Sequence, residues 1–219
     1  MKTELKKCGI QFTEGLTDIE ILKIEDIYEI QFPISLRKFY REGMPFSDDE
    51  YEFPRWTDYS DANISRIKAY WMQGPIDRLL PHIENGYWIP EWGKRPEQIE
   101  DVVSTFMKIA QKAPKLIPIY RNAYMPMLDG VEDAPIISAV EFDVVYALHN
   151  LQDFIECCFL ADNYNCARKE KLAVKSRLHI PFWSDIFNYN IEIAAKNYND
   201  GIKKGIATEK DFKTPEDFI

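Results

Sequence analysis

The sequence lacks the compact motifs by which enzymes and metal proteins are commonly recognised. It has no Gly-x-Ser-x-Gly segment, no glycine-rich phosphate-binding loop, and neither paired histidines nor a Cys-x-x-Cys pair. Its three histidines, His82, His149 and His179, are far apart, as core or surface histidines usually are. An acid–base site would need His149 to converge with Glu141 or Asp143 in a closed pocket. The sequence therefore predicts no enzyme, no metal site and no cofactor.

Signals for secretion, for a membrane anchor or for a second domain are also missing. The charged N-terminus is not followed by an apolar run, and no Gly/Ser/Pro-rich linker divides the 219 residues. Cys157 and Cys158 are adjacent in a predicted helix, where they cannot easily pair, and Cys8 and Cys166 show no disulfide-framework spacing. We therefore predict one domain, residues 1–219, with reduced cysteines, in the cytoplasm.

Acidic residues are concentrated in two parts of a chain whose net charge at pH 7 is −9. No Lys or Arg occurs between Arg121 and Arg168, an interval that contains eight acidic residues. Residues 48–61 contain six more, with only Arg55 against them, and a basic stretch lies at residues 168–177. A concentrated negative field repels nucleic acid and steers a cationic protein partner. We expect no direct nucleic-acid binding and no membrane binding.

The partner-binding residues are predicted from this charge and from aromatic side chains, because interface hot spots favour aromatic anchors. The first candidates are in the strand region: Asp129, Glu132, Asp133, Glu141 and Asp143. The second candidates are Asp48, Asp49, Glu50 and Glu52. Tyr51 and Tyr124 are the expected exposed aromatic anchors. A solvated acidic face with no partner is the alternative that charge alone leaves open.

Helical periodicity indicates several amphipathic helices. Thr17 and Glu20 form a predicted capping box, and an apolar stripe from Ile21 to Tyr28 follows it. Pro33 suits the first turn of a second helix that stops at Gly43. A third helix is predicted to begin at Ser60 or Asp61 and to turn Ile64, Ile67 and Trp71 inward. A fourth is predicted to begin at Pro96, with an apolar stripe from Ile99 to Ala110. Two more are predicted over residues 151–159 and from Trp183 to Gly201.

Strands are predicted in the middle of the chain, at residues 116–120 and 124–127. Between Ile136 and Leu148 the side chains alternate in the way that a strand requires, which would allow one long strand. Such a strand would be about twice the usual 5–6 residues. We therefore predict a hairpin that turns near Phe142 and Asp143. Helices flanking an antiparallel sheet give an α+β fold.

Two tryptophans lie in the segment Gly-Tyr-Trp-Ile-Pro-Glu-Trp-Gly-Lys-Arg-Pro, residues 86–96. Large rings favour burial and each indole N–H needs an acceptor. We expect Trp88 and Trp92 to be largely buried and Arg95 to be held by a carboxylate or by backbone carbonyls. With Gly93 and Pro96 they make the pattern Trp-x-x-x-Trp-Gly-x-Arg-Pro, which resembles the central motif of the SUKH superfamily of Smi/Knr-like proteins.

Other segments follow in the order that this superfamily shows. Residues 32–40, Phe-Pro-Ile-Ser-Leu-Arg-Lys-Phe-Tyr, are similar to its second helix, and residues 116–120, Leu-Ile-Pro-Ile-Tyr, are similar to the strand after its tryptophan motif. A late Pro-Phe-Trp-Ser-Asp at residues 181–185 completes the order. The resemblance covers about residues 16–185, and residues 186–219 are then an extra C-terminal helical tail.

The resemblance implies a SUKH-like fold, with an antiparallel sheet flanked by helices, and a function without catalysis. Bacterial members serve mainly as immunity proteins, so the chain is expected to bind and neutralise a cognate toxin domain. A basic toxin such as a nuclease would suit the acidic surface. The alternative, implied by eukaryotic relatives, is a regulatory or scaffolding module for signalling or cell-wall partners.

Overall fold

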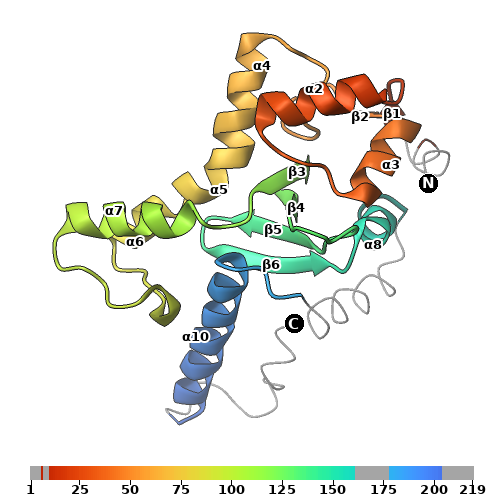
Figure 1. Ribbon diagram of the computed structural model, residues 1–219. Helices are drawn as coiled ribbons and strands as arrows, with labels where there is room; N and C mark the ends of the chain where they lie inside the picture. Colours follow the sequence, from red (N-terminus) through yellow and green to blue (C-terminus); the bar gives the residue numbers. More distant parts are fainter. Residues whose placement is uncertain (1–5, 7–9, 161–177, 204–219) are drawn as a thin grey trace.

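A four-stranded antiparallel sheet lies at the centre of the structure (Figure 1). The computed structural model describes residue 6, residues 10–160 and residues 178–203, so the basic stretch at 168–177 lies outside the described residues. The hairpin predicted between Ile136 and Leu148 is confirmed, because Val140 pairs with Asp143 around a turn at residues 141–142. The strands, in chain order and in sheet order, are β3 (Leu116–Tyr120), β4 (Ala123–Pro126), β5 (Ile136–Val140) and β6 (Asp143–Leu148).

Two helices and a two-stranded sheet precede the central sheet. The capping box at α2 (Asp18–Tyr28) is confirmed: the Thr17 hydroxyl accepts from the backbone N–H of Glu20, whose carboxylate accepts from the backbone N–H of Thr17. The helix α3 (Ile34–Glu42) follows Pro33 and ends at Gly43, as predicted. The short sheet pairs β1 (Gln11–Phe12) with β2 (Pro45–Phe46) and was not predicted from the sequence.

An irregular helical stretch crosses the upper left of Figure 1. It begins as α4 (Asp61–Arg66), where the Ser60 hydroxyl accepts from the backbone N–H of Asn63. It then widens into a π-helix, η1 (Ile67–Gln73), which buries Ile67 and Trp71 as predicted and leaves Ile64 half-buried. The short helices α5 (Gly74–Asp77) and α6 (Leu80–Glu84) follow. The π-helix, α5 and α6 were not predicted from the sequence.

The remaining helices begin or end at residues other than those predicted. The helix α7 (Ile99–Ala110) starts after Gln98 rather than at Pro96, and Ile99 is exposed instead of belonging to the buried stripe. The helix α10 (Trp183–Lys203) continues through Gly201, so the prediction that Gly201 ends it is wrong. The predicted helix at residues 151–159 is α8 (Leu151–Ile155), extended by a second π-helix, η3 (Glu156–Leu160).

The helices pack on the sheet through one continuous apolar core, which makes the fold α+β as predicted. On β6, the Tyr146 ring meets the Phe187 ring of α10 with centroids 5.2 Å apart, and the Tyr146 hydroxyl lies 2.5 Å from Ser184 Oγ. None of the described helices combines the length and the apolar composition that crossing a bilayer requires.

The tryptophan segment packs into this core unevenly. A short 3₁₀ helix, η2 (Pro90–Trp92), buries Trp92, whose ring stacks on Phe182 at 5.6 Å and meets Phe106 at 5.5 Å between centroids. Trp88 is less buried than Trp92, at intermediate exposure, and its indole N–H donates to Gly93 O at 2.8 Å.

Arg95 satisfies the prediction that backbone carbonyls would hold it. Its Nη2 donates to Ile83 O at 3.2 Å and to Glu84 O at 3.4 Å, which joins the tryptophan segment to α6. The segment therefore connects α6, α7 and α10 around the Trp92 ring.

We predict that Trp92→Ala lowers the free energy of unfolding by about 3–5 kcal/mol, because it removes a core aromatic ring. Trp88→Ala is the matched control and should cost less, since Trp88 is half-buried. Chemical denaturation of both variants measures the difference. If Trp92→Ala kept the wild-type stability but lost partner binding, the segment would be a binding site rather than a structural one.

Candidate functional site

The structure places the first group of acidic candidates at the two opposite ends of the sheet. We call the end that holds the β3–β4 turn (residues 121–122) and the β5–β6 turn (residues 141–142) the turn end, and the other the far end. Glu141 and Asp143 lie at the turn end. Residues 129–133 lie in the β4–β5 connection at the far end, about 17 Å away along β5 at 3.4 Å per residue. These five residues therefore do not form one patch.

At the far end, two of the acidic candidates accept hydrogen bonds within the fold, Glu132 through its backbone and Asp133 through its carboxylate. The backbone carbonyl of Glu132 accepts from the N–H of Ser35 at 3.1 Å, and Asp133 Oδ1 accepts from the N–H of Leu151 at 3.4 Å, at the start of α8. The carboxylates of Asp129 and Glu132 are exposed beside an open hollow of about 360 Å³.

At the turn end, two of the second group of acidic candidates form ion pairs with arginines that are distant in the sequence. Arg121 forms an ion pair with the Glu52 carboxylate, and Arg66 Nε lies 3.6 Å from Glu50 Oε2. The hydrogen bond from Arg121 is the largest cause of a lowered pKa at Glu52. The net negative charge of this loop is therefore smaller than the sequence suggests, and the exposed carboxylates of Asp48 and Asp49 carry most of what remains.

A groove of about 430 Å³ opens beside this loop, between the π-helix and the strands. Tyr51 and Tyr70 stand on its wall with ring centroids 5.0 Å apart, and their side chains are 45% and 46% exposed. The prediction that Tyr51 is exposed is confirmed. The same prediction for Tyr124 is wrong: this residue is 1% exposed, because it lies on β4 and its side chain faces the core while bordering the groove.

Two features of the helical stretch place an arginine in this groove. The Arg78 guanidinium rests against Gly74, where a Cβ would lie 2.6 Å from Nη1 and would displace the end of this flexible side chain. Arg78 Nη1 donates to Tyr70 O at 3.4 Å, in the middle of the π-helix. Burial raises the pKa of the Tyr124 phenol, and the Arg78 guanidinium, hydrogen-bonded to it, partly opposes this rise. Neither Tyr70 nor Arg78 was predicted as a site residue from the sequence, because neither belongs to a local motif.

The residues that could support acid–base chemistry do not converge. His149 follows β6 at the far end, whereas Glu141 and Asp143 lie at the turn end, so the acid–base site considered above is not formed. Instead His82 Nε2 lies 3.0 Å from Glu141 Oε2, with both side chains partly exposed. Among the described residues, no group of three or more His, Cys, Asp or Glu side chains is placed to hold a metal ion.

Comparisons of the chain with protein-family models, with curated proteins and with solved structures give no match. The groove itself combines exposed aromatic rings with guanidinium and carboxylate groups, the composition that interface hot spots favour. The chemistry that these groups provide is recognition through ring contacts, hydrogen bonds and ion pairs.

We predict that Glu52→Gln lowers the stability at neutral pH by at most about 1 kcal/mol, because it removes a partly exposed ion pair. The folded-state pKa of Glu52 is lowered, so its stabilisation is present above the ordinary glutamate pKa and is lost as the pH falls through the lowered value. The difference between wild type and variant should therefore vanish in acid.

Denaturation of both proteins over a pH series measures this difference. Glu29→Gln, which removes one partner of an exposed pair with Lys115, is the control and should change stability little at any pH. A difference for Glu52→Gln that persisted at acid pH would contradict the assignment to the ion pair.

Proposed function

We propose that the chain is an immunity protein of the SUKH type, which binds a cognate toxin domain in the cytoplasm and neutralises it without catalysis. The observation that carries this proposal is the groove at the turn end, where two half-exposed tyrosines stand beside arginines and exposed carboxylates. The order of the sequence motifs from residue 16 to residue 185, with the α+β fold, supports the same assignment.

The tyrosine pair is suited to anchor a partner protein. Tyr51 and Tyr70 together present large amphipathic rings that lose little conformational entropy on binding. Their phenol groups and the guanidinium of Arg78 offer hydrogen bonds beside these rings, and residues of these types dominate measured interface energies. Val140, exposed on the opposite side of the groove, adds apolar surface.

The exposed carboxylates around the groove would act mainly on the rate of association. Asp48 and Asp49 lie at the turn end with Glu141, and their field extends about 8 Å at physiological ionic strength. A toxin with a basic surface would be steered toward this end of the sheet. A basic nuclease is the class of toxin that these charges favour, since such enzymes need cations to hold phosphate groups.

The test of the proposed function is co-expression with the product of the neighbouring gene. If that gene encodes a toxin with a variable C-terminal domain, the chain should restore growth and co-purify with that domain. If the neighbour is not a toxin, or if growth is not restored, the immunity function is wrong. A neighbouring gene of cell-wall synthesis would instead favour the regulatory or scaffolding alternative.

We predict that Tyr70→Ala weakens binding of the toxin domain by about 30-fold or more, as expected for a hot-spot truncation of 2 kcal/mol. Because Tyr70 is nearly half exposed, the stability of the free protein should change little. Ile19→Ala removes an exposed apolar side chain on α2 and is the matched control. Calorimetric titration with the toxin domain measures the affinity of both variants. Equal affinities for the two variants would show that Tyr70 is not part of the interface.

We predict that reversing Asp48 and Asp49 together to Lys slows association about 10-fold or more at low salt, and that the effect shrinks as salt rises. Asp26→Lys, an exposed reversal on α2, should have a smaller effect. Reversal of Asp129 and Glu132 tests the far end in the same series. If the association rates changed neither with ionic strength nor with any of these reversals, the acidic residues would be only a solvated surface.

A further inference from the structure

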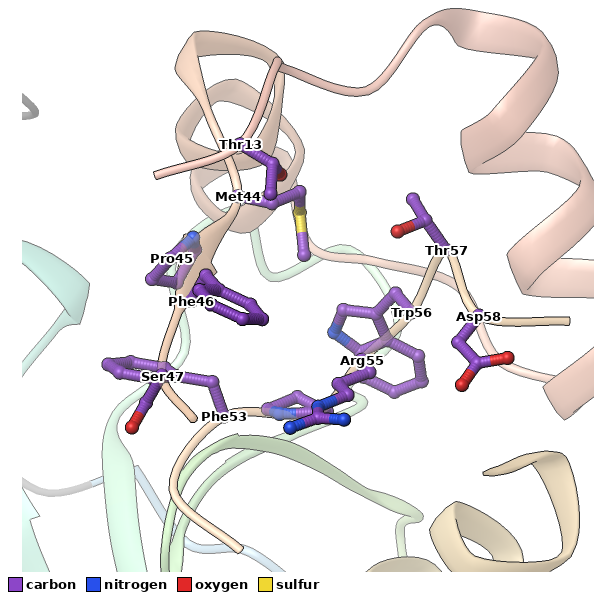
Figure 2. A pocket seen from close by; sticks show the side chains of 11 residues that line it. Thr13, Met44, Pro45, Phe46, Ser47, Phe53, Arg55, Trp56, Thr57 and Asp58 are labelled. Atoms are coloured by element: carbon purple, nitrogen blue, oxygen red, sulfur yellow. The ribbon is translucent and has the colours of Figure 1, made fainter. Parts of the chain in front are cut away.

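A cavity of about 230 Å³ lies beside β2 of the small β1–β2 sheet (Figure 2). Thr13 and residues 44–47 form one side of it, and residues 53–58 form the other. Both sides are fixed by backbone and side-chain hydrogen bonds. The N–H of Thr13 donates to Met44 O at 2.9 Å, and the buried Asn63 amide donates to Arg55 O at 2.9 Å and to Asp58 O at 2.7 Å. The cavity is therefore formed before any ligand arrives.

The walls of this cavity are apolar and mostly flat. In Figure 2 the side chains of Met44, Phe46 and Trp56 point toward one common space. Trp56 is fixed, since its indole N–H donates to the Tyr40 hydroxyl at 3.3 Å and its ring meets Tyr28 edge-on at 5.0 Å between centroids. Flat rings and a thioether are surfaces on which a planar apolar body packs well.

Two charged residues, Arg55 and Asp58, line the cavity, and Arg55 has a donor without a partner in the described structure. Arg55 donates through Nη2 to Asp48 O at 3.1 Å, but its buried Nε–H has no hydrogen-bond partner among the described residues. No ion pair joins this guanidinium to a carboxylate in the described part of the chain. A buried donor without an acceptor is costly, and a ligand oxygen would relieve that cost. The Asp58 carboxylate, which also lines the cavity, accepts from the N–H of Ser60, and this hydrogen bond, with a smaller effect of the Arg55 charge, lowers its pKa.

We propose that this cavity binds a small planar aromatic carboxylate, with its ring against Phe46 and its carboxylate on Arg55. The volume equals about eight water molecules at their 30 Å³ share of the liquid, which is room for one bicyclic ring with a short acidic arm. A guanidinium and a carboxylate form charge-assisted hydrogen bonds, which discriminate a carboxylate from a neutral or cationic group. Binding here requires no partner protein, so its test is independent of the toxin experiment.

Three probes that share an indole ring test the site: indole-3-acetate, 3-methylindole and tryptamine. Titrations followed by the NMR signals of the Arg55 Nε–H and of the Trp56 indole N–H should show indole-3-acetate binding about 10-fold or more tightly than 3-methylindole. Tryptamine should also bind more weakly than indole-3-acetate, because its ammonium group cannot accept a hydrogen bond from Arg55. Equal affinity for the three probes, or an Arg55 signal that does not move at saturation, would overturn the proposal.

The matched variants are Arg55→Gln and Arg41→Gln. Arg55→Gln should lower the affinity for indole-3-acetate about 10-fold or more and leave that for 3-methylindole unchanged. Arg41→Gln removes an exposed guanidinium that pairs with Asp18 outside the cavity, and it should change neither affinity. If Arg55→Gln does not fold, the wild-type titration with the three probes decides alone. Unchanged affinity in a folded Arg55→Gln protein would refute the role of the guanidinium.

Discussion

The contacts of Arg121 hold together the three segments that form the groove. Its backbone N–H donates to Glu52 O at 2.8 Å, and its backbone oxygen accepts from the indole N–H of Trp71 at 3.0 Å. Its guanidinium pairs with the Glu52 carboxylate. Its backbone is left-handed, with a φ of 48°, in the tight turn between β3 and β4. One turn residue thus fixes the acidic loop and the π-helix against the sheet, and the exposed Tyr70, next to the buried Trp71, is set beside Tyr51.

Local signals were enough to predict much of the fold. The Thr17–Glu20 capping box and the hairpin from Ile136 to Leu148 depend on residues close in sequence, and both are confirmed. Helix ends were predicted less well, because packing rather than composition decides them. Gly201 lies inside α10 although glycine often ends helices, and α7 starts after Gln98 although Pro96 suits a first turn.

The site was harder to predict because its residues meet only in the folded chain. A count of charges along the sequence could not show that Arg66 and Arg121 fold onto the acidic loop. Tyr124 was expected at the surface as an aromatic anchor, but it lies on β4, and its side chain is on the face of that strand that packs in the core. Arg78 follows α5, rests against Gly74 and lines the groove, an arrangement that no periodicity indicates.

The arrangement of charges at the turn end bears on how a partner would be selected. Exposed carboxylates attract any cationic protein at long range, which raises encounter rates but gives little discrimination. Arg78 and Arg121 lie within the groove, so a partner that is uniformly basic would meet repulsion at close range. A partner that fits must therefore match both signs, with cations over Asp48 and Asp49 and neutral or acidic groups over the arginines. If the chain is an immunity protein, as proposed, this combination of attraction and repulsion would distinguish its own toxin from others of similar charge.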